Sequence, residues 1–120
     1  MGGTDYVSEI LKCCQRREQA LLNDRSMGRY NRYFDKMRKL ARKLIDENRQ
    51  EKLLPYLESE SISVQRDIAG LLFHCYPDLC GQKFREISGM TIETGLPKHL
   101  VVVAAAAKCN LKYGVPKDFP

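Results

Sequence analysis

The sequence predicts an all-α fold in a single domain, residues 1–120. Apolar residues recur at steps of three and four in successive segments, which is the spacing of one face of a helix. No segment alternates apolar and polar residues with a period of two, and no hairpin dipeptide separates two apolar runs. The length of 120 residues suits one domain, and 43% hydrophobic and 29% charged residues are typical of a globular chain.

The first two helices are predicted over residues 4–23 and along the apolar stripe from Tyr30 to Ile45. Thr4 or Asp5 can cap the first, and Ser26 to Gly28 form a break before the second. The second carries the longest apolar stripe of the chain: Tyr30, Tyr33, Phe34, Met37, Leu40, Ala41, Leu44 and Ile45.

Two further helices follow a short connection. A brief helix is expected over 50–58, with Leu53, Leu54 and Leu57 buried, and a polar turn over 58–61 ends it. Ser61 or Ser63 can cap the next helix, which Pro77 ends. Its predicted inner face is Val64, Ile68, Leu71, Leu72 and Cys75.

The last two helices begin at prolines. Pro77-Asp78 opens one that carries Leu79, Cys80, Phe84, Ile87 and Met90 and ends near Gly89. Leu96-Pro97 begins the other, whose centre, residues 100–107, is apolar on every side. This centre is either a helix wrapped by its neighbours or a buried strand; its four alanines and Gly114 as a C-terminal stop favour a helix in the middle of a bundle.

Two segments of the chain resemble each other at an offset of 36 residues. Val64, Ile68 and Ala69 align with Leu100, Ala104 and Ala105, and the offset is close to the period of HEAT and armadillo repeats. Leu53-Leu54-Pro55-Tyr56-Leu57, a polar turn and the helix from Val64 resemble the HEAT-like superfamily, in which a leucine-proline helix precedes a Val-Arg-x-x-Ala-Ala helix. Gln65 replaces the usual arginine here and Ile68 the first alanine, so Arg66 is the candidate to make that arginine's contact.

This resemblance implies about six helices packed as antiparallel pairs in a short right-handed α-solenoid. The layout of residues 29–114 is also similar to a bacterial family of short HEAT-like proteins of unknown function. Relatives of that size are similar to immunity proteins, which neutralise secreted toxins of neighbouring cells. The resemblance therefore implies a binding protein and no enzyme or cofactor.

The residues themselves indicate no catalytic or metal centre. The five cysteines, an odd number without Cys-x-x-Cys spacing, predict neither a disulfide framework nor a zinc knuckle. His74, Cys75, Cys80 and Cys109 leave a metal site open on paper, although their spacing matches no standard zinc pattern. We found no nucleophile with a base, no paired carboxylates and no phosphate loop at diagnostic spacing.

Basic residues are concentrated on the second predicted helix. Between Arg25 and Lys43, eight lysines and arginines stand against one acid, Asp35. Steps of three and four place five of them along one side, and we name these the basic ridge: Arg29, Arg32, Lys36, Lys39 and Lys43. Arg66, Lys108 and Lys112 are further candidate partner contacts, on the expectation that repeat curvature gathers them on one concave surface. The alternative interpretation is a solvated helix face.

The net charge of +5 is compatible with two kinds of partner. An acidic protein surface, most concretely a toxin domain, is the first expectation; the alternative is a nucleic acid whose phosphates the basic ridge grips. Acidic residues gather at the opposite end, which would orient a docked protein: Asp46, Glu47, Glu51, Glu58 and Glu60. We expect a cytoplasmic protein without a membrane partner, because no apolar run spans a bilayer and no signal peptide is present. The sequence leaves the oligomeric state open.

Overall fold

The computed structural model describes residues 5–24 and 27–120, and in them the chain is all-helical, without a β-strand. Thr4 as a cap and Ser26 in the predicted break lie outside these residues, and the break is wrong for Met27 and Gly28, which belong to the second helix. The five α-helices are α1 (Tyr6–Gln19), α2 (Met27–Asp46), α3 (Ile62–Leu72), α4 (Pro77–Ser88) and α5 (Val101–Tyr113). Shorter segments lie between them: the π-helical turn η1 (Ala20–Asp24) and the 3-10 helices η2 (Gln50–Glu58), η3 (Ile92–Thr94) and η4 (Lys98–Leu100). None of the described helices is both long and apolar enough to cross a bilayer.

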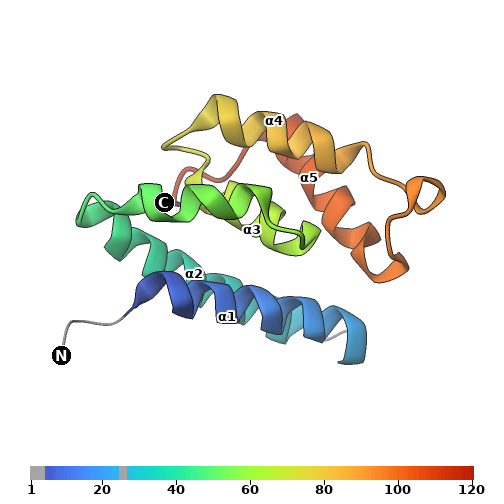
Figure 1. Cartoon of the computed structure of the whole chain (residues 1–120), viewed down its shortest axis with the longest axis horizontal. Coiled ribbons are helices and arrows are strands. Elements are labelled where there is room, and N and C mark those ends of the chain that lie inside the picture. Colours follow the sequence, from blue (N-terminus) through green and yellow to red (C-terminus); the bar gives the residue numbers. More distant parts are fainter. Residues whose placement is uncertain (1–4, 25–26) are drawn as a thin grey trace.

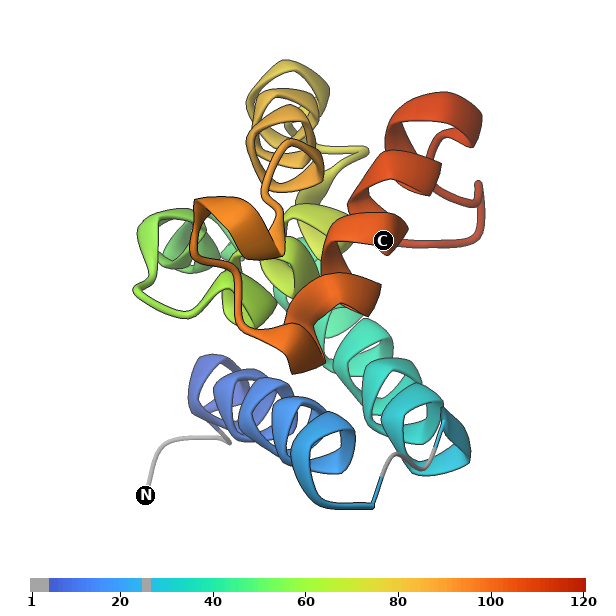
Figure 2. The same ribbon diagram turned by 90° about the vertical axis from the view of Figure 1, so that its right-hand side faces the viewer.

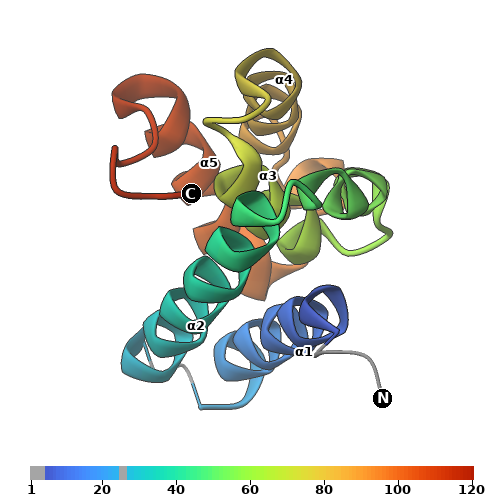
Figure 3. The same cartoon turned by 90° about the vertical axis from the view of Figure 1, so that its left-hand side faces the viewer.

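Consecutive segments pack as neighbours in space. Helices α1 and α2 lie side by side, η2 packs on α3, and α4 packs on α5. Figure 1 shows these pairs one above another, with α3 between the α1/α2 pair and the α4/α5 pair. The end-on views in Figures 2 and 3 agree, since α3 lies at the centre in both.

The capping residues explain where the helices begin and end. Asp5 Oδ1 accepts a hydrogen bond from the Ser8 N–H (3.1 Å) at the start of α1, and Ser61 Oγ accepts one from the Val64 N–H (3.2 Å) at the start of α3. Pro77 opens α4, where its missing N–H costs nothing. Gly95 has a φ of 103°, a left-handed conformation that a side chain would disfavour, and so ends the η3 turn.

The core lies between the three pairs. It includes Ile10 and Cys14 from α1 and Leu53 and Leu57 from η2, all of which are buried. Of the predicted stripe of α2, five residues are buried, Tyr30, Phe34, Met37, Ala41 and Leu44, whereas Tyr33, Leu40 and Ile45 are half-buried. Leu54, predicted to be buried, is half-buried, and Leu79 of α4 is 49% exposed. The segment 50–58 has the predicted bounds.

The helix surrounded on every side is α3, and not the last helix. From Ser63 to Leu72 all side chains but that of Gln65 are buried, because η2, α4, α1, α2 and α5 all contact this helix. In α5 only the side towards α3 and α4 is covered, and Val101 and Val102 are 44% and 37% exposed. The prediction that the last helix is wrapped in the middle of the bundle is therefore wrong, and its exposed apolar side chains need another explanation.

Candidate functional site

The basic ridge occupies the solvent side of α2. The opposite side of this helix buries Tyr30, Phe34, Met37, Ala41 and Leu44. Because a helix repeats every 3.6 residues, the ridge positions fall on the far side from this stripe. All five of its side chains are exposed: Arg29, Arg32, Lys36, Lys39 and Lys43.

Little of the ridge's charge is neutralised within the protein. In the part of the chain that the structure describes, Arg32, Lys36 and Lys39 form no ion pair, and the Lys43 Nζ lies 5.5 Å from the centre of the Tyr6 ring. The nearby acid, Asp35, is paired with Arg38, at 3.4 Å from Nη1 to Oδ1. Arg32, Lys36 and Lys39 are therefore cations whose counter-charges come from the solvent or from a partner.

A hollow of about 500 Å³ adjoins the ridge. It lies between α2 and the C-terminal tail, and Lys39 and Lys43 belong to both the ridge and the hollow. Its lining residues are Asp35, Arg38, Lys39, Arg42, Lys43, Asp118 and Pro120. Both acidic side chains in this lining contact Arg38, and among the described residues Lys39 and Arg42 form no ion pair.

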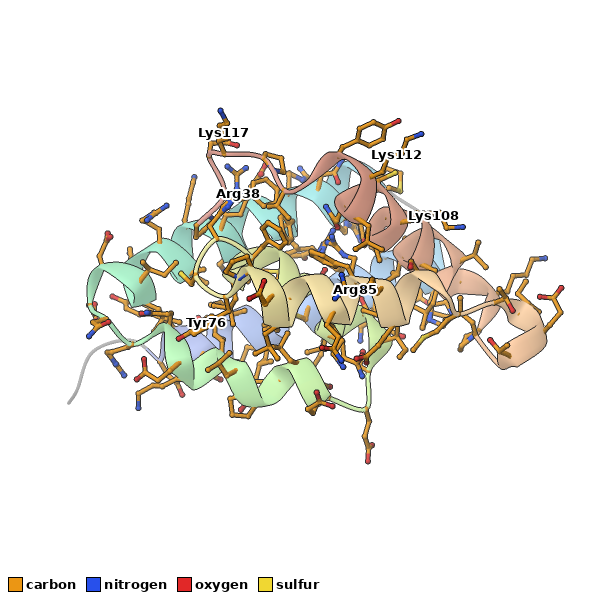
Figure 4. All side chains as sticks on the ribbon, turned by 90° about the horizontal axis from the view of Figure 1, so that it is seen from above. Arg38, Tyr76, Arg85, Lys108, Lys112 and Lys117 are labelled. Atoms are coloured by element: carbon orange, nitrogen blue, oxygen red, sulfur yellow. The ribbon has the colours of Figure 1, made fainter. Side chains whose placement is uncertain are left out.

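The C-terminal tail forms one wall of this hollow, and the sequence reasoning missed it. The Phe119 ring packs against the Phe34 ring with centroids 5.4 Å apart, and the Arg38 guanidinium lies 4.5 Å from the Phe119 centroid. Arg38 also donates to Asp118 Oδ2 at 2.9 Å (Figure 4 shows Arg38 and Lys117 on this side of the molecule). A hydrogen bond of 2.8 Å joins His74 Nε2 to the Pro116 carbonyl oxygen. The sequence feature that could have indicated this packing is an aromatic residue, Phe119, that follows Gly114 and Pro116.

A buried network of charged side chains holds α2 in place. Arg17 of α1 donates from Nε to the Tyr30 carbonyl oxygen of α2 (3.1 Å) and from Nη1 to Asp67 of α3. Its guanidinium also stacks on the rings of Tyr30 and Phe34, at 3.7 and 4.6 Å from their centroids. A cation that contacts α2 through both backbone and rings fixes the rotation of this helix, and with it the direction in which the ridge points.

Arg66 belongs to this network and not to the partner surface. It is 7% exposed, and its guanidinium donates to Asp67 Oδ1 (3.2 Å) and to Asn110 Oδ1 of α5 (3.1 Å). The expectation that Arg66 shares an accessible concave surface with Lys108 and Lys112 is therefore wrong for Arg66. The contact with Asn110 joins α3 to α5.

Lys108 and Lys112 are exposed and follow each other along α5 (Figure 4). The Lys112 Nζ lies 5.2 Å from the centre of its neighbour's ring, Tyr113. Both lysines lie on the α4/α5 pair, whereas the basic ridge lies on the solvent side of the α1/α2 pair. The structure thus distributes the predicted contact residues over two surfaces and the interior.

The thiols and histidines are dispersed. Burial raises the pKa of Cys14, as does the neighbouring Asp67 carboxylate, and burial raises the pKa of Cys80 to about 12. Cys109 is exposed on α5, and both histidines are engaged elsewhere, His74 with Pro116 and His99 with Glu18. Within residues 5–24 and 27–120, no three His, Cys, Asp or Glu side chains gather as a metal site would require.

Comparison with known proteins returned no family model, no curated relative and no solved structure that matches this chain.

Proposed function

We propose that this chain is a non-catalytic binding module that docks the basic ridge of α2 onto an acidic surface of a partner protein. The observation that carries the proposal is the exposed charge of Arg32, Lys36 and Lys39, which form no ion pair among the described residues. Cations on a surface attract an acidic partner over about 8–10 Å at physiological ionic strength, and this attraction raises the rate of association.

Rigidity supports a docking role for this surface. The Arg17 contacts to the Tyr30 carbonyl and the two aromatic rings fix α2 from inside, and the tail braces Arg38 from outside. A preorganised surface loses less conformational entropy when it binds.

The distribution of acids supports a defined orientation of the docked partner. Glu47, Glu51 and Glu58 lie around the C-terminal end of α2 and along η2, beyond the end of the ridge. Two of these acids are already paired, Glu47 with Arg49 (3.1 Å) and Glu58 with Lys83 (3.4 Å). These pairs reduce the negative charge at this end of the molecule but do not remove it. A partner surface with acids that face the ridge would be attracted there and repelled at the η2 end.

The resemblance to short HEAT-like proteins narrows this proposal. We take the pairs α1/α2, η2/α3 and α4/α5 as a short HEAT-like solenoid and the partner as a bacterial toxin domain that the chain blocks, as an immunity protein does. The competing function is a nucleic-acid-binding repeat in which the ridge and its hollow grip phosphates. Tyr30 and Phe34 of α2 are buried against Arg17 and so are not available to stack on bases, whereas Tyr33, which lines a hollow together with Arg29, is half-buried.

Two titrations distinguish the partner classes. Wild type and Arg32→Glu/Lys36→Glu/Lys39→Glu are titrated with a mixed pool of tRNA and duplex DNA at low and moderate salt. The control, Lys12→Glu/Lys52→Glu/Lys117→Glu, changes the net charge equally at exposed positions outside the ridge. The protein-binding proposal expects no nucleic-acid binding that depends on the ridge.

The second titration uses protein partners. Immobilised wild type, ridge variant and control variant are exposed to nuclease-treated lysate of the source cell, and each captured protein is then purified and titrated alone. The proposal expects a direct complex with wild type and control that the ridge variant does not form. If the wild type and the control bind nucleic acid tightly and in a salt-sensitive way, and the ridge variant does not, the protein-binding proposal is wrong and the nucleic-acid-binding function takes its place.

A further inference from the structure

The first half of α5 presents an apolar surface that the ridge proposal does not use. Val101, Val102 and Ala105 are exposed there, and Leu22 of η1 and Met27 of α2 lie opposite, 54% and 47% exposed. Between them is a hollow of about 630 Å³. Its lining is apolar except for two residues: Leu21, Leu22, Met27, Lys98, His99, Val101, Val102 and Ala105.

A second hollow, of about 280 Å³, lies on the other side of the same helix. It shares Val101 and Ala105 with the first and is also lined by Ile92, which is 55% exposed, and by Lys108. The second hollow also has polar lining residues, Ser88, Thr91 and Glu93. Val101 and Ala105, one helical turn apart, therefore form a crest with a hollow on each side, and we name this surface the α5 crest. Two hollows flanking a crest match the way in which side chains of one helix pack between those of another.

One carboxylate, that of Glu18, holds in place the segment that leads into the crest. Glu18 of α1 is bonded through Oε2 to His99 Nε2 of η4 at 2.9 Å, and its Oε1 accepts a hydrogen bond from Ser61 Oγ at 3.2 Å. This arrangement ties the start of the last helical segment to α1 and to the start of α3. The crest is consequently preformed in the free chain, which lowers the entropy cost of docking.

The charge around the crest is mostly positive. Beyond Ala105 the exposed side of α5 continues with Lys108 and Lys112, and Lys98 lies at the other end. Among the described residues, Lys98 and Lys108 form no ion pair, and Glu93 is the acid on the rim of the second hollow. An occupant that fits this pattern is apolar where it meets Val101 and Ala105 and acidic where it meets Lys108 and Lys112.

We propose that the α5 crest binds an amphipathic helix of a partner protein, antiparallel to α5. The apolar stripe of that helix packs on the crest, and acids in its first turn pair with Lys108 and Lys112. The direction follows from the helix dipole, because acids stabilise the N-terminal turn of a helix and the lysines lie at the C-terminal end of α5. From Val101 to Lys112 the contact extends about 17 Å, or three turns.

Charge favours this occupant over a second copy of the chain. Two copies that met through the α5 crest would bring two molecules of net charge +5 together and would place Lys98 and Lys108 of each near those of the other. An acidic helix instead removes the same apolar surface from water and pairs the lysines.

The test uses the full chain and a fluorescent peptide of about 18 residues with acids in its first turn and leucines at steps of three and four. One matched peptide replaces the acids with lysines, and another keeps the charges but scrambles the leucines. Fluorescence anisotropy should show the acidic peptide binding at least about tenfold more tightly than either matched peptide, a free-energy difference of about 1.4 kcal/mol.

Neutral substitutions then locate the binding site. Val101→Ser/Val102→Ser should weaken peptide binding at least about fivefold, a typical minimum for a contact in the centre of an interface. Leu79→Ser, an exposed apolar residue of α4 outside both hollows, should leave it unchanged. Lys108→Gln/Lys112→Gln should remove the preference for the acidic peptide, whereas Lys12→Gln/Lys117→Gln should keep it.

Equal binding of the scrambled peptide, or an affinity that Val101→Ser/Val102→Ser does not change, would overturn the proposal. A wild-type dimer in sedimentation equilibrium that Val101→Ser/Val102→Ser dissociates would also overturn it and would assign the crest to a second copy. The peptide assay involves no partner of the basic ridge, so its failure and the failure of the ridge proposal are separate outcomes.

Discussion

Arg17 and Asp67 form an ion pair in the interior of the protein, between α1 and α3 and 50 positions apart in the sequence. Both side chains are almost completely buried, at 3% and 1% exposure. Since Arg66 also contacts Asp67, two cations share one carboxylate, and the aromatic rings of Tyr30 and Phe34 cover the face of the first cation. The pair connects the ridge-bearing half of the molecule to the centre.

The first prediction is that Asp67→Ala strongly destabilises the fold. The substitution leaves Arg17 buried without its partner, and breaking a buried pair from one side costs about 3–5 kcal/mol. Urea denaturation followed by circular dichroism measures the loss. Asp35→Ala, which removes the exposed ion pair with Arg38, should cost less than about 1 kcal/mol. Similar losses in the two variants would show that the interior network contributes little.

The network also shows what sequence reasoning can and cannot reach. The apolar stripe of α1 runs through Ile10 and Cys14 and continues to Leu21 of η1, and Arg17 stands between Cys14 and Leu21. Asp67 likewise stands between Val64 and Leu71 on α3. A charged residue of opposite sign within the stripe of each of two helices was a signal for a buried pair. Helical periodicity identifies each position but does not say which helices meet.

The helices and most of their ends could be predicted because their causes are local. Ser61 caps α3, Pro77 opens α4 and segment 50–58 has the predicted bounds. The prediction that Pro77 also ends the preceding helix is wrong, because α3 ends at Leu72, before Cys75. Which side of α5 is buried could not be predicted, because this depends on which elements pack on that helix. The same holds for Arg66, whose long side chain turns inward to Asp67 and Asn110 instead of outward.

The second prediction concerns thiol reactivity. Cys109 is exposed and should react rapidly with a thiol reagent such as Ellman's reagent in the native protein. Cys13, Cys14 and Cys80 are buried and should react only as fast as the protein opens or unfolds. The time course of absorbance at low and at denaturing urea concentrations measures both classes. Rapid reaction of all five thiols without denaturant would contradict the described core.

A loss of stability in alkaline solution is the third prediction. Burial raises the pKa of Cys80 from 9.0 to about 12 and also raises the pKa of Cys13, Cys14 and Tyr30. The unfolded thiol releases its proton at a lower pH than the folded one, so Cys80 contributes full stability below about pH 9 and loses it as the pH rises towards 12. Each such thiol lowers the free energy of unfolding by up to about 1.4 kcal/mol per pH unit in this window.

Denaturation midpoints at pH 8, 9 and 10 test this dependence, with Cys80→Ala as the variant. Its stability at pH 8 should be lower than that of wild type, because a buried side chain is truncated, but its slope above pH 9 should be shallower. A slope identical to that of wild type would mean that Cys80 is not held protonated by the fold.

The fourth prediction is that the tail stabilises α2 through Phe119. Phe119→Ala removes the contact with the Phe34 ring and the cover over Arg38, which together should cost about 1–2 kcal/mol. Asp118→Asn keeps the ring and removes only an exposed ion pair, so it should cost less than about 1 kcal/mol. Thermal unfolding of both variants measures the two losses. A larger loss in Asp118→Asn than in Phe119→Ala would show that the ion pair with Arg38, and not the Phe119 ring, holds the tail against α2.

The central claim is that the basic ridge of α2 is the surface that binds an acidic protein partner. Isothermal titration of the purified partner against wild type, Arg32→Glu/Lys36→Glu/Lys39→Glu and Lys12→Glu/Lys52→Glu/Lys117→Glu tests it most directly, at two salt concentrations. We predict that the ridge variant loses at least about tenfold in affinity, that the control variant stays close to wild type, and that salt weakens wild-type binding. Equal losses in the two variants, or a wild-type affinity that does not respond to salt, would contradict the claim.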